Sequence, residues 1–522
     1  MDKVINYFRL KNMGASHGLM TGVVVLLGGF NLLFGEIVPA GGGFGWDGVI
    51  YANMTRNIDS FISNGQLSGY YAQRIIPSII VREILILSDT AFSDINIIRG
   101  FLIYNLMLLV VASWVWKRLS DKFALSVFGR WIGFCGIFIN FSVSKQAFYY
   151  PVLTDVTALL LGLLLLLFYV EKRPIAILIT AIVGAFVWQL ASIYGAILLL
   201  FLKSKIPNDA IDSENNLFDI SGFAVKRIWL VTLMLSIIGI LFISFILDAY
   251  QVSNIDYHLN KYFSKITSVE SSELEIVPLI TGIPSVFAVF VALFVLIGSR
   301  SVFQVILKDT LKPNPILMAF AIAAILIPFL VVKAISNPLL PNANGVGWVL
   351  LHAFFIPPAG KVLLPLVSLA VFWGPVVLLI LINWNAFCVE LRKLGPGVMV
   401  VVGLSLPLGL VTEPRYITSV WPFMVFGLVL TLEHCASRSQ YFKWVFAILT
   451  VLFAQFWLKI NIAPWSGGEY EQLLEFPKQM FFFHYGFWMS WPSYLVQFPI
   501  VLLGVFLLKK SMFYNALYEN TN

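Results

Sequence analysis

Residues 152–202 read VLTDVTALLLGLLLLLFYVEKRPIAILITAIVGAFVWQLASIYGAILLLFL, and this stretch decides the fold class. Two apolar runs flank the short charged turn Glu171-Lys172-Arg173. An apolar run of about 20 residues is long enough to cross the hydrocarbon core of a bilayer as a helix. We therefore predict that this part of the chain crosses a membrane more than once.

The composition of the whole chain agrees with this prediction. Of 522 residues, 59% are hydrophobic and 12% are charged, whereas soluble domains carry about 25% charged residues. A soluble enzyme, a disordered chain and a fibrous chain are therefore excluded. The net charge of +7 is typical of basic cytoplasmic loops and does not indicate a nucleic-acid partner. Three scattered cysteines and five histidines without paired spacing predict neither disulfides nor a metal site.

About thirteen apolar runs have the length of a membrane span. The first is too long for a signal-peptide core, so we expect it to be a span with the N-terminus inside. The candidates are 17–38, 98–116, 123–143, 152–170, 174–202, 228–247, 278–297, 315–335, 361–382, 397–412, 417–432, 442–460 and 490–508.

The fifth run, 174–202, is expected to be broken. Basic residues flank both of its ends, so both ends are predicted to be cytoplasmic. As one helix it would be about 43 Å long at ~1.5 Å per residue, against about 30 Å of hydrocarbon. Its polar centre at Trp188-Gln189 predicts a hairpin of two short helices, 174–187 and 190–202, with the apex outside. One tilted helix is the alternative.

The predicted fold is an all-α polytopic membrane protein of about 12–14 transmembrane helices, in a single integral membrane domain over residues 1–522. With the hairpin, both termini lie in the cytoplasm. The cytoplasmic loops are short, and we expect function in the long outer segments, which are 39–97, 248–277, 336–360 and 461–489.

The first outer loop begins with a glycine-rich turn, Gly41 to Gly48, which contains Asp47. Apolar residues then recur every three or four positions over 49–62, which predicts an amphipathic helix lying in the membrane interface. Asp47 is expected at the N-cap of this helix, and its role is either that of a cap or a catalytic one. Another helix is predicted to start at 70–77, with the cations Arg74 and Arg82.

Asp155 stands at the outer entrance of the fourth predicted span. A carboxylate just inside an apolar span is costly unless it is paired or faces a wet cavity, so it is functional by default. The alternative is a helix cap, with Pro151 at the beginning of the helix.

Thr412-Glu413-Pro414-Arg415-Tyr416 lies between two apolar runs. Glu413 and Arg415 cannot face lipid, so they face a cavity or each other. An arginine suits a phosphate group, which it meets with two parallel hydrogen bonds. A local ion pair that locks a helical hairpin is the alternative.

The outer segment 336–360 contributes two further candidates for substrate binding, His352 and the adjacent Lys361. A histidine in such a loop is more often an ordinary surface residue. Lys361 begins the next predicted span, where a lysine also reaches the interface simply by snorkelling.

Taken together, these motifs resemble the GT-C superfamily of integral-membrane glycosyltransferases, which take sugar from a polyprenyl-phosphate-linked donor. The resemblance rests on Gly45-Trp46-Asp47-Gly48 after the first span, on Pro151 and Asp155 before the helical hairpin, and on Glu413-Pro414-Arg415-Tyr416 followed by Pro422. It covers roughly 17–202 and 397–432, so 203–522 is largely a variable helical part. Two features depart from the family: Asp47 has no acidic neighbour, and no large soluble C-terminal domain follows.

The resemblance implies sugar transfer with inversion on the periplasmic face of a bacterial inner membrane. Asp47 would be the general base. Arg415, supported by Arg74 or Arg82, would bind the donor phosphate, and Asp155 would position the acceptor or help to hold a divalent cation, Mg²⁺ or Mn²⁺. The implied partners are the lipid bilayer, a polyprenyl-phosphate sugar donor and a glycan, lipid or protein acceptor of the cell envelope.

Two other functions remain open at this stage. A transporter or flippase of lipid-linked sugars would suit a broken helical hairpin, but its polar residues should gather near the bilayer midplane. A polysaccharide polymerase or ligase would depend more on a large outer loop late in the chain. Asp47, Asp155 and Arg415 meeting in one outer cavity would favour the transferase.

Overall fold

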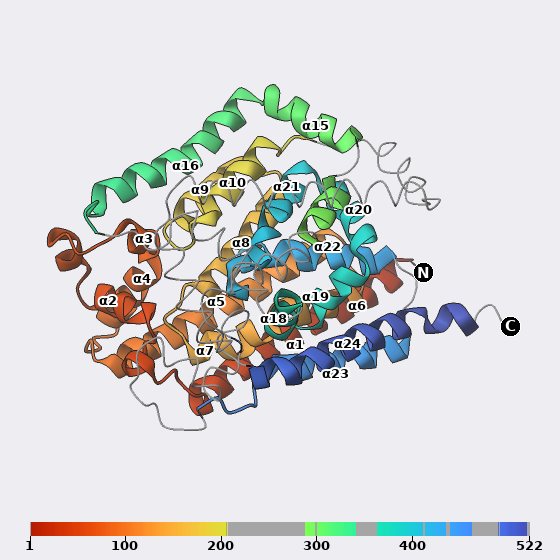
Figure 1. Cartoon of the computed structure of the whole chain (residues 1–522), viewed down its shortest axis with the longest axis horizontal. Coiled ribbons are helices and arrows are strands. Elements are labelled where there is room, and N and C mark those ends of the chain that lie inside the picture. The colour runs from red at the N-terminus through yellow and green to blue at the C-terminus, as the bar shows by residue number, and fades with distance from the viewer. Residues whose placement is uncertain are drawn as a thin grey trace, which may run out of the picture.

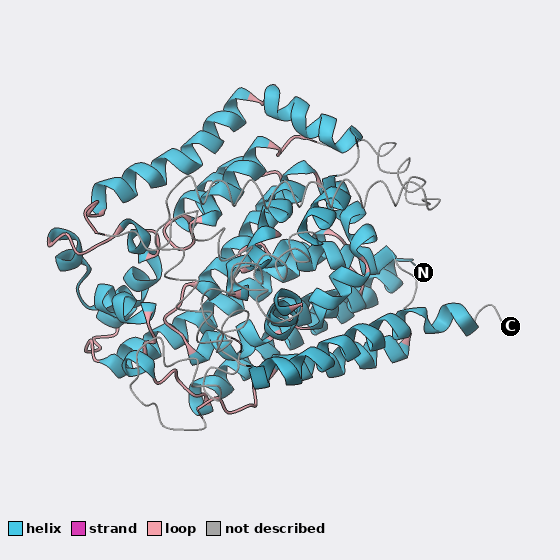
Figure 2. Ribbon diagram, viewed as in Figure 1, coloured by secondary structure: helices cyan, strands magenta, loops and turns pink. Residues whose placement is uncertain are grey.

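The computed structural model describes residues 2–204, 206, 288–297, 300–340, 363–410, 413–434, 439–461, 489 and 491–518. These ranges fold into a bundle of helices (Figure 1) and contain no β-strand (Figure 2). The all-α prediction is therefore confirmed. The predicted span 228–247 and the outer segment 248–277 lie outside the described residues.

Four helices are long and apolar enough to cross a bilayer: Ser16–Phe34 within α1 (Asp2–Phe34), α5 (Asp94–Lys122), α16 (Pro315–Ile335) and Ser493–Met512 within α24 (Trp491–Tyr518). The number is six if each of two bent helix pairs forms one span. These pairs are α6 (Val127–Phe138) with Ser142–Tyr149, and α19 (Pro375–Ile382) with α20 (Trp384–Leu394). The chain thus has several candidate transmembrane helices.

The other apolar helices are shorter. They are α8 (Asp155–Val170), α9 (Pro174–Gly184), α10 (Leu190–Leu200), Ala288–Ile297, α18 (Leu364–Trp373), α21 (Pro396–Ser405), α22 (Trp421–His434) and α23 (Gln440–Ala454). The remaining helical elements are η1 (Ala40–Gly43), α2 (Asp47–Ser63), α3 (Gly69–Ala72), α4 (Ile75–Leu87), η2 (Ser142–Gln146), α7 (Ala147–Tyr149), α15 (Arg300–Leu311), η4 (Pro407–Leu410) and η5 (Pro414–Ile417).

The predicted break within 174–202 is confirmed, because α9 ends at Gly184 and α10 begins at Leu190. The two arms pack closely through small residues. A Cβ on Gly195 would lie 2.3 Å from the Cβ of Ala181, so no larger residue fits there without moving an arm. The hairpin packs against α8 on one side and α16 on the other.

Helices α5 and α8 run parallel and in register. The hydroxyl groups of Tyr104 and Thr157 are 3.0 Å apart, and Arg118 donates to Glu171 at 2.6 Å; in both pairs the partners are 53 positions apart in the sequence. The same offset sets Asp155 level with Leu102, on the Asp94 side of the middle of α5. Asp155 therefore lies off the centre of this candidate span, displaced toward its Asp94 end.

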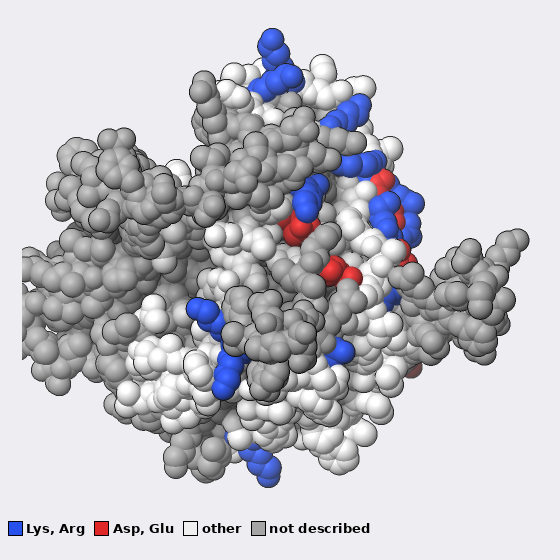
Figure 3. Space-filling model, turned by 90° about the vertical axis from the view of Figure 1, so that its right-hand side faces the viewer, with Lys and Arg blue, Asp and Glu red and all other residues white. Residues whose placement is uncertain are grey.

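The opposite end of the bundle is rich in basic residues. Helix α1 begins there and α24 ends there (Figure 1), and the C-terminal end of α5 brings Lys117, Arg118 and Lys122. Seen from this side, Lys and Arg side chains are more prominent than Asp and Glu (Figure 3). Helices α2, α3 and α4 lie at the other end of the bundle (Figure 1).

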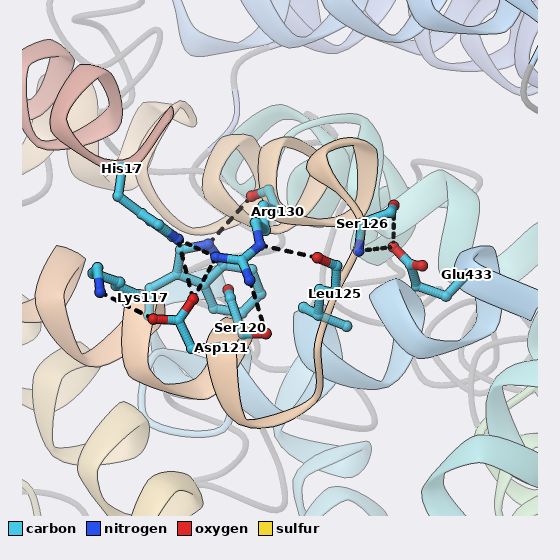
Figure 4. A network of polar contacts seen from close by, with 9 residues as sticks. His17, Lys117, Ser120, Asp121, Leu125, Ser126, Arg130 and Glu433 are labelled. Carbon is cyan, nitrogen blue, oxygen red and sulfur yellow. Dashed lines mark hydrogen bonds and ion pairs between the residues drawn. The ribbon is translucent and has the colours of Figure 1, made fainter. Parts of the chain in front are cut away.

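A buried arginine fastens three helices at the basic end. Arg130 of α6 is fully buried and donates to Asp121 of α5 at 2.6 Å and to the backbone oxygen of Leu125 at 2.9 Å. It also contacts the ring of His17 in α1 (Figure 4). Each of these contacts offsets the cost of burying a charge, so we interpret this network as a structural anchor.

Candidate functional site

The turn before α2 is shaped by one tyrosine. Gly45 has a φ of +70°, and a Cβ there would lie 2.2 Å from the ring of Tyr150. The backbone N–H of Gly48 donates to the Tyr150 hydroxyl at 3.3 Å. The glycines on either side of Trp46-Asp47 thus let the backbone pass close to Tyr150, which fixes where the Asp47 side chain leaves the chain.

The predicted N-cap role of Asp47 is wrong. Helix α2 begins at Asp47 itself, Trp46 occupies the N-cap, and the N-cap side chain forms no capping hydrogen bond. A carboxylate in the first turn is still favoured by the helix dipole. Since it does not bond to the backbone ahead of it, the half-buried carboxylate is turned to other partners. Among the described residues its hydrogen-bond donor is the Tyr71 hydroxyl, at 3.5 Å.

The segment after α2 brings a stacked cation to the same place. The guanidinium carbon of Arg74 lies 3.7 Å from the centre of the Tyr70 ring, a cation–π contact. Its Nη1 is buried and has no hydrogen-bond partner among the described residues. A buried donor left unpaired costs about 1–3 kcal/mol. Within the described part of the chain, Arg74 therefore has a donor to spare.

The charges in this region fix the protonation of their neighbours. Burial, followed by the charge of Asp47, raises the pKa of Tyr71 well above its ordinary value, so its hydroxyl keeps its proton near neutral pH. Burial by itself lowers the pKa of Arg74, but Tyr51, Tyr70 and Asp47 raise it on balance. Tyr71 is therefore a donor and Arg74 a permanent cation.

The alternative interpretation of Asp155 as a cap is also wrong. The N-cap of α8 is Thr154, and no side chain caps this helix. Asp155 is 7% exposed. Within the described ranges neither of its carboxylate oxygens has a hydrogen-bond partner, and Oδ2 lies 3.7 Å from Nη1 of Arg415. Asp155 is thus a buried carboxylate with spare capacity to accept hydrogen bonds.

Arg415 has both kinds of partner that the sequence suggested. It forms a local ion pair with Glu413, which was the alternative expected from the sequence. It also forms an ion pair with Asp155 of helix α8. Its helical turn η5 is held by Trp373, whose indole N–H donates to the backbone oxygen of Pro414 at 3.0 Å. Burial lowers the pKa of Arg415, but Glu413 and Asp155 more than reverse this.

These residues form one group, which we call the outer polar cluster: Asp47, Tyr70, Tyr71, Arg74, Asp155, Trp188, Glu413, Arg415 and Tyr416. The Tyr71 hydroxyl donates to Asp47 at 3.5 Å, the Tyr71 ring lies 5.0 Å from that of Tyr70, and Arg74 stacks on Tyr70. Trp188, at the apex of the α9–α10 hairpin, lies with its ring 6.4 Å from that of Tyr416. Segments far apart in the sequence therefore converge here.

One predicted residue, Arg82, does not join the cluster, and two others are not described. Arg82 donates to the backbone oxygens of Thr55 and Arg56, at 3.2 and 2.5 Å, just before the break in α2 at Asn57. It therefore supports α2 and is not available to a phosphate. His352 and Lys361 lie outside the described residues.

The sequence interpretation missed four aromatic members of the site. Tyr70, Tyr71, Tyr150 and Trp188 received no role, although the first two flank Asp47 and Arg74 in space. A weak signal was available, because two adjacent tyrosines four and three residues before an arginine are well placed to stack on it. No sequence feature indicated Tyr150, whose contact with the glycines is purely tertiary.

The cluster does not fit a divalent cation. No group of three or more His, Cys, Asp or Glu side chains that could hold a metal ion occurs in the part of the chain that the structure describes. The carboxylates of Asp155 and Glu413 already face the guanidinium group of Arg415. Two arginines thus stand where the positive charge of a metal would be needed.

No family model matches the chain, and neither the curated proteins nor the solved structures compared with it gave a match.

Proposed function

We propose that the protein is a GT-C-type glycosyltransferase. It moves a sugar from a polyprenyl-phosphate-linked donor to a glycan, lipid or protein acceptor of the cell envelope. The observation that carries the proposal is a chain of contacts from Asp47 through Tyr71 and Tyr70 to Arg74, and from Arg74 through Trp188 to Tyr416, the neighbour of Arg415. A candidate base thereby lies beside cations that suit a phosphate.

Asp47 takes a proton from the acceptor hydroxyl group. The acceptor oxygen then bonds to the anomeric carbon as the bond between that carbon and the phosphate oxygen breaks, and polyprenyl phosphate leaves with the bonding electrons. Attack from the opposite face inverts the anomeric configuration. A carboxylate accepts several hydrogen bonds, so the single long contact from Tyr71 at 3.5 Å leaves room for the acceptor hydroxyl.

Arg74 makes the first contact with the donor phosphate. The sequence favoured Arg415 for this role, but the charge of Arg415 is already shared between Glu413 and Asp155. Arg74 has a buried N–H that lacks a partner within the described ranges. Stabilising the negative charge that develops on the leaving phosphate is the largest contribution expected from such a site, and Arg415 adds to the field.

The position of the cluster favours a transferase over a transporter. Asp155 lies level with Leu102, away from the basic end of α5. Basic ends of spans are typically cytoplasmic, so the cluster would face the periplasm of a bacterial inner membrane, with both termini inside and about 12–14 crossings in all. Transporter sites are found near the bilayer midplane. The broken α9–α10 hairpin is the feature that keeps a transporter or flippase as the second candidate.

Turnover by the purified protein in nanodiscs tests the proposal. The donors are a panel of undecaprenyl-phosphate sugars, namely a hexose, an N-acetylhexosamine and a pentose, offered with envelope lipid and glycan extracts. Mass spectrometry follows the released undecaprenyl phosphate and the glycosylated product. General-base catalysis contributes about 10²–10⁴-fold, so Asp47→Asn should lower kcat by that factor. Asp59→Asn, on an exposed position of the same helix, is the matched control.

A folded Asp47→Asn protein with full activity would contradict the role of Asp47. Movement of a labelled lipid-linked sugar between leaflets of proteoliposomes, without any transfer product, would favour the transporter.

A further inference from the structure

Three buried polar groups in the outer polar cluster have no hydrogen-bond partner among the described residues, although Asp155 is ion-paired with Arg415. They are the Nη1 atom of Arg74, the carboxylate of Asp155 and the indole nitrogen of Trp188. Trp188 is 5% exposed and Asp155 is 7% exposed. Leaving such groups without a hydrogen bond is costly, and folded proteins rarely tolerate several of them together.

Packing places Trp188 over the first turn of α8. Its side chain shares a small apolar cluster with Ala158 and Leu161 of α8, and Ala158 is one helical turn beyond Asp155, on the same face. The Trp188 ring also lies 5.9 Å from the guanidinium carbon of Arg74. The indole thus packs against the face of α8 that carries Asp155 and also lies near the guanidinium group of Arg74.

The apex that carries Trp188 is tied to the rest of the site. The backbone N–H of Ile76, two residues after Arg74, donates to the backbone oxygen of Phe186 at 3.2 Å. The Trp188 backbone N–H bonds back to Gly184 at 2.8 Å. Both bonds fix the backbone of the apex relative to Arg74, and the packing against Ala158 and Leu161 holds the indole there.

The two side chains have complementary needs. An indole N–H only donates a hydrogen bond, and a carboxylate only accepts one. A hydroxyl group does both, so one hydroxyl can satisfy Trp188 and Asp155 together. Aromatic side chains also offer a flat apolar surface that suits the face of a sugar ring, and the Tyr416 ring 6.4 Å from Trp188 extends that surface.

We propose that Trp188 and Asp155 form a subsite for one hydroxyl group of the transferred sugar, beside the phosphate held by Arg74. The subsite rests on the function proposed above and adds a specificity-determining residue, Trp188, to it. Donors that lack this hydroxyl are discriminated against, because they leave both buried groups unpaired.

Trp188→Phe tests the subsite, because it removes the N–H and keeps an aromatic ring against Ala158. With the best donor of the undecaprenyl-phosphate panel, we expect kcat/KM to fall about three- to tenfold, the usual range for one hydrogen bond. Donors that each lack one hydroxyl group identify the hydroxyl that is bound. For one of these donors the wild-type kcat/KM should be lower than for the full donor, and Trp188→Phe should not lower it further. Asp155→Asn should show the same selective pattern with that donor.

Trp384→Phe is the matched control. The indole nitrogen of Trp384 is also buried and without a partner among the described residues, but α20 lies at the other end of the bundle from α3 and α4 (Figure 1). It should leave kcat/KM unchanged on every donor. Unchanged kcat/KM in Trp188→Phe, or an equal loss on all deoxygenated donors, would overturn the subsite while the wild-type transfer activity still stands. Absence of transfer by the wild type would overturn the proposed function itself.

Discussion

The guanidinium group of Arg415 lies 3.7 Å from the carboxylate of Asp155, and this ion pair joins η5 to the first turn of α8. Neither charge would be stable at such depth alone, because an isolated buried charge costs several kcal/mol. The pair also engages Arg415 with protein carboxylates. Of the two arginines, Arg74 is consequently the one with a spare hydrogen-bond donor among the described residues. This is why we assign the phosphate contact to Arg74 and a supporting electrostatic role to Arg415.

Removing the arginine of this pair should destabilise the protein. In Arg415→Met, Asp155 and Glu413 lose their cationic partner, and breaking a buried pair in this way costs about 3–5 kcal/mol. We expect the unfolding temperature in detergent, measured by intrinsic fluorescence, to be clearly lower than that of the wild type. Adding Asp155→Asn should recover part of the loss, because the unpaired charge is then gone. Arg99→Met, at an exposed position of α5, is the control. An Arg415→Met protein as stable as wild type would contradict the buried pair.

Arg74 should matter for donor binding. In Arg74→Lys the charge remains, but the planar group that stacks on Tyr70 and presents Nη1 is lost. Hydrogen bonds to charged groups contribute about 1.5–3 kcal/mol, so the KM for the undecaprenyl-phosphate donor should rise about 10–100-fold. The steady-state rate as a function of donor concentration measures this. Arg82→Lys should change KM much less, since Arg82 bonds to the α2 backbone; equal effects of the two changes would refute the assignment.

The turn before Asp47 allows steric clash to be separated from backbone strain. Gly42 and Gly45 have similar φ angles, +66° and +70°, but a Cβ meets nothing within 4 Å at Gly42 and the Tyr150 ring at 2.2 Å at Gly45. Gly42→Ala should therefore cost about 1 kcal/mol of strain, with activity retained. Gly45→Ala should destabilise more and lower kcat, because Asp47 must move with the turn.

Thermal unfolding and turnover of the two glycine variants provide the comparison. In Gly45→Ala, the second change Tyr150→Leu should return part of the stability by removing the clash. Matching losses in Gly42→Ala and Gly45→Ala would show that the Tyr150 contact does not position the turn.

Metal removal should leave the activity intact. The outer polar cluster supplies positive charge from Arg74 and Arg415, and its carboxylates at Asp155 and Glu413 already face a guanidinium group. We expect turnover after treatment with EDTA to stay within about twofold of the untreated enzyme. Loss of turnover on chelation, with recovery on adding Mg²⁺ or Mn²⁺, would contradict this arrangement.

The sequence by itself determined the class of fold and one break in it. Apolar runs too long for a soluble protein predicted α5 and α16, and the polar centre at Trp188-Gln189 predicted the separation of α9 from α10. These features are local, because a helix in lipid must satisfy its backbone within its own segment. The scarcity of charged residues in apolar surroundings likewise singled out Asp47, Asp155 and Arg415, since each needs a partner or a wet cavity.

Only the tertiary structure decided which partner each charge has. It paired Arg415 with Asp155 and Glu413 and bonded Arg82 to the backbone of α2. It left Arg74 with an N–H that has no partner in the described ranges. It also showed that Asp47 and Asp155 are not the N-cap residues of their helices, although their sequence positions suggested this role. Hydrogen bonds and ion pairs act over a few ångströms between side chains that the chain brings together from distant segments, and no local pattern records that distance.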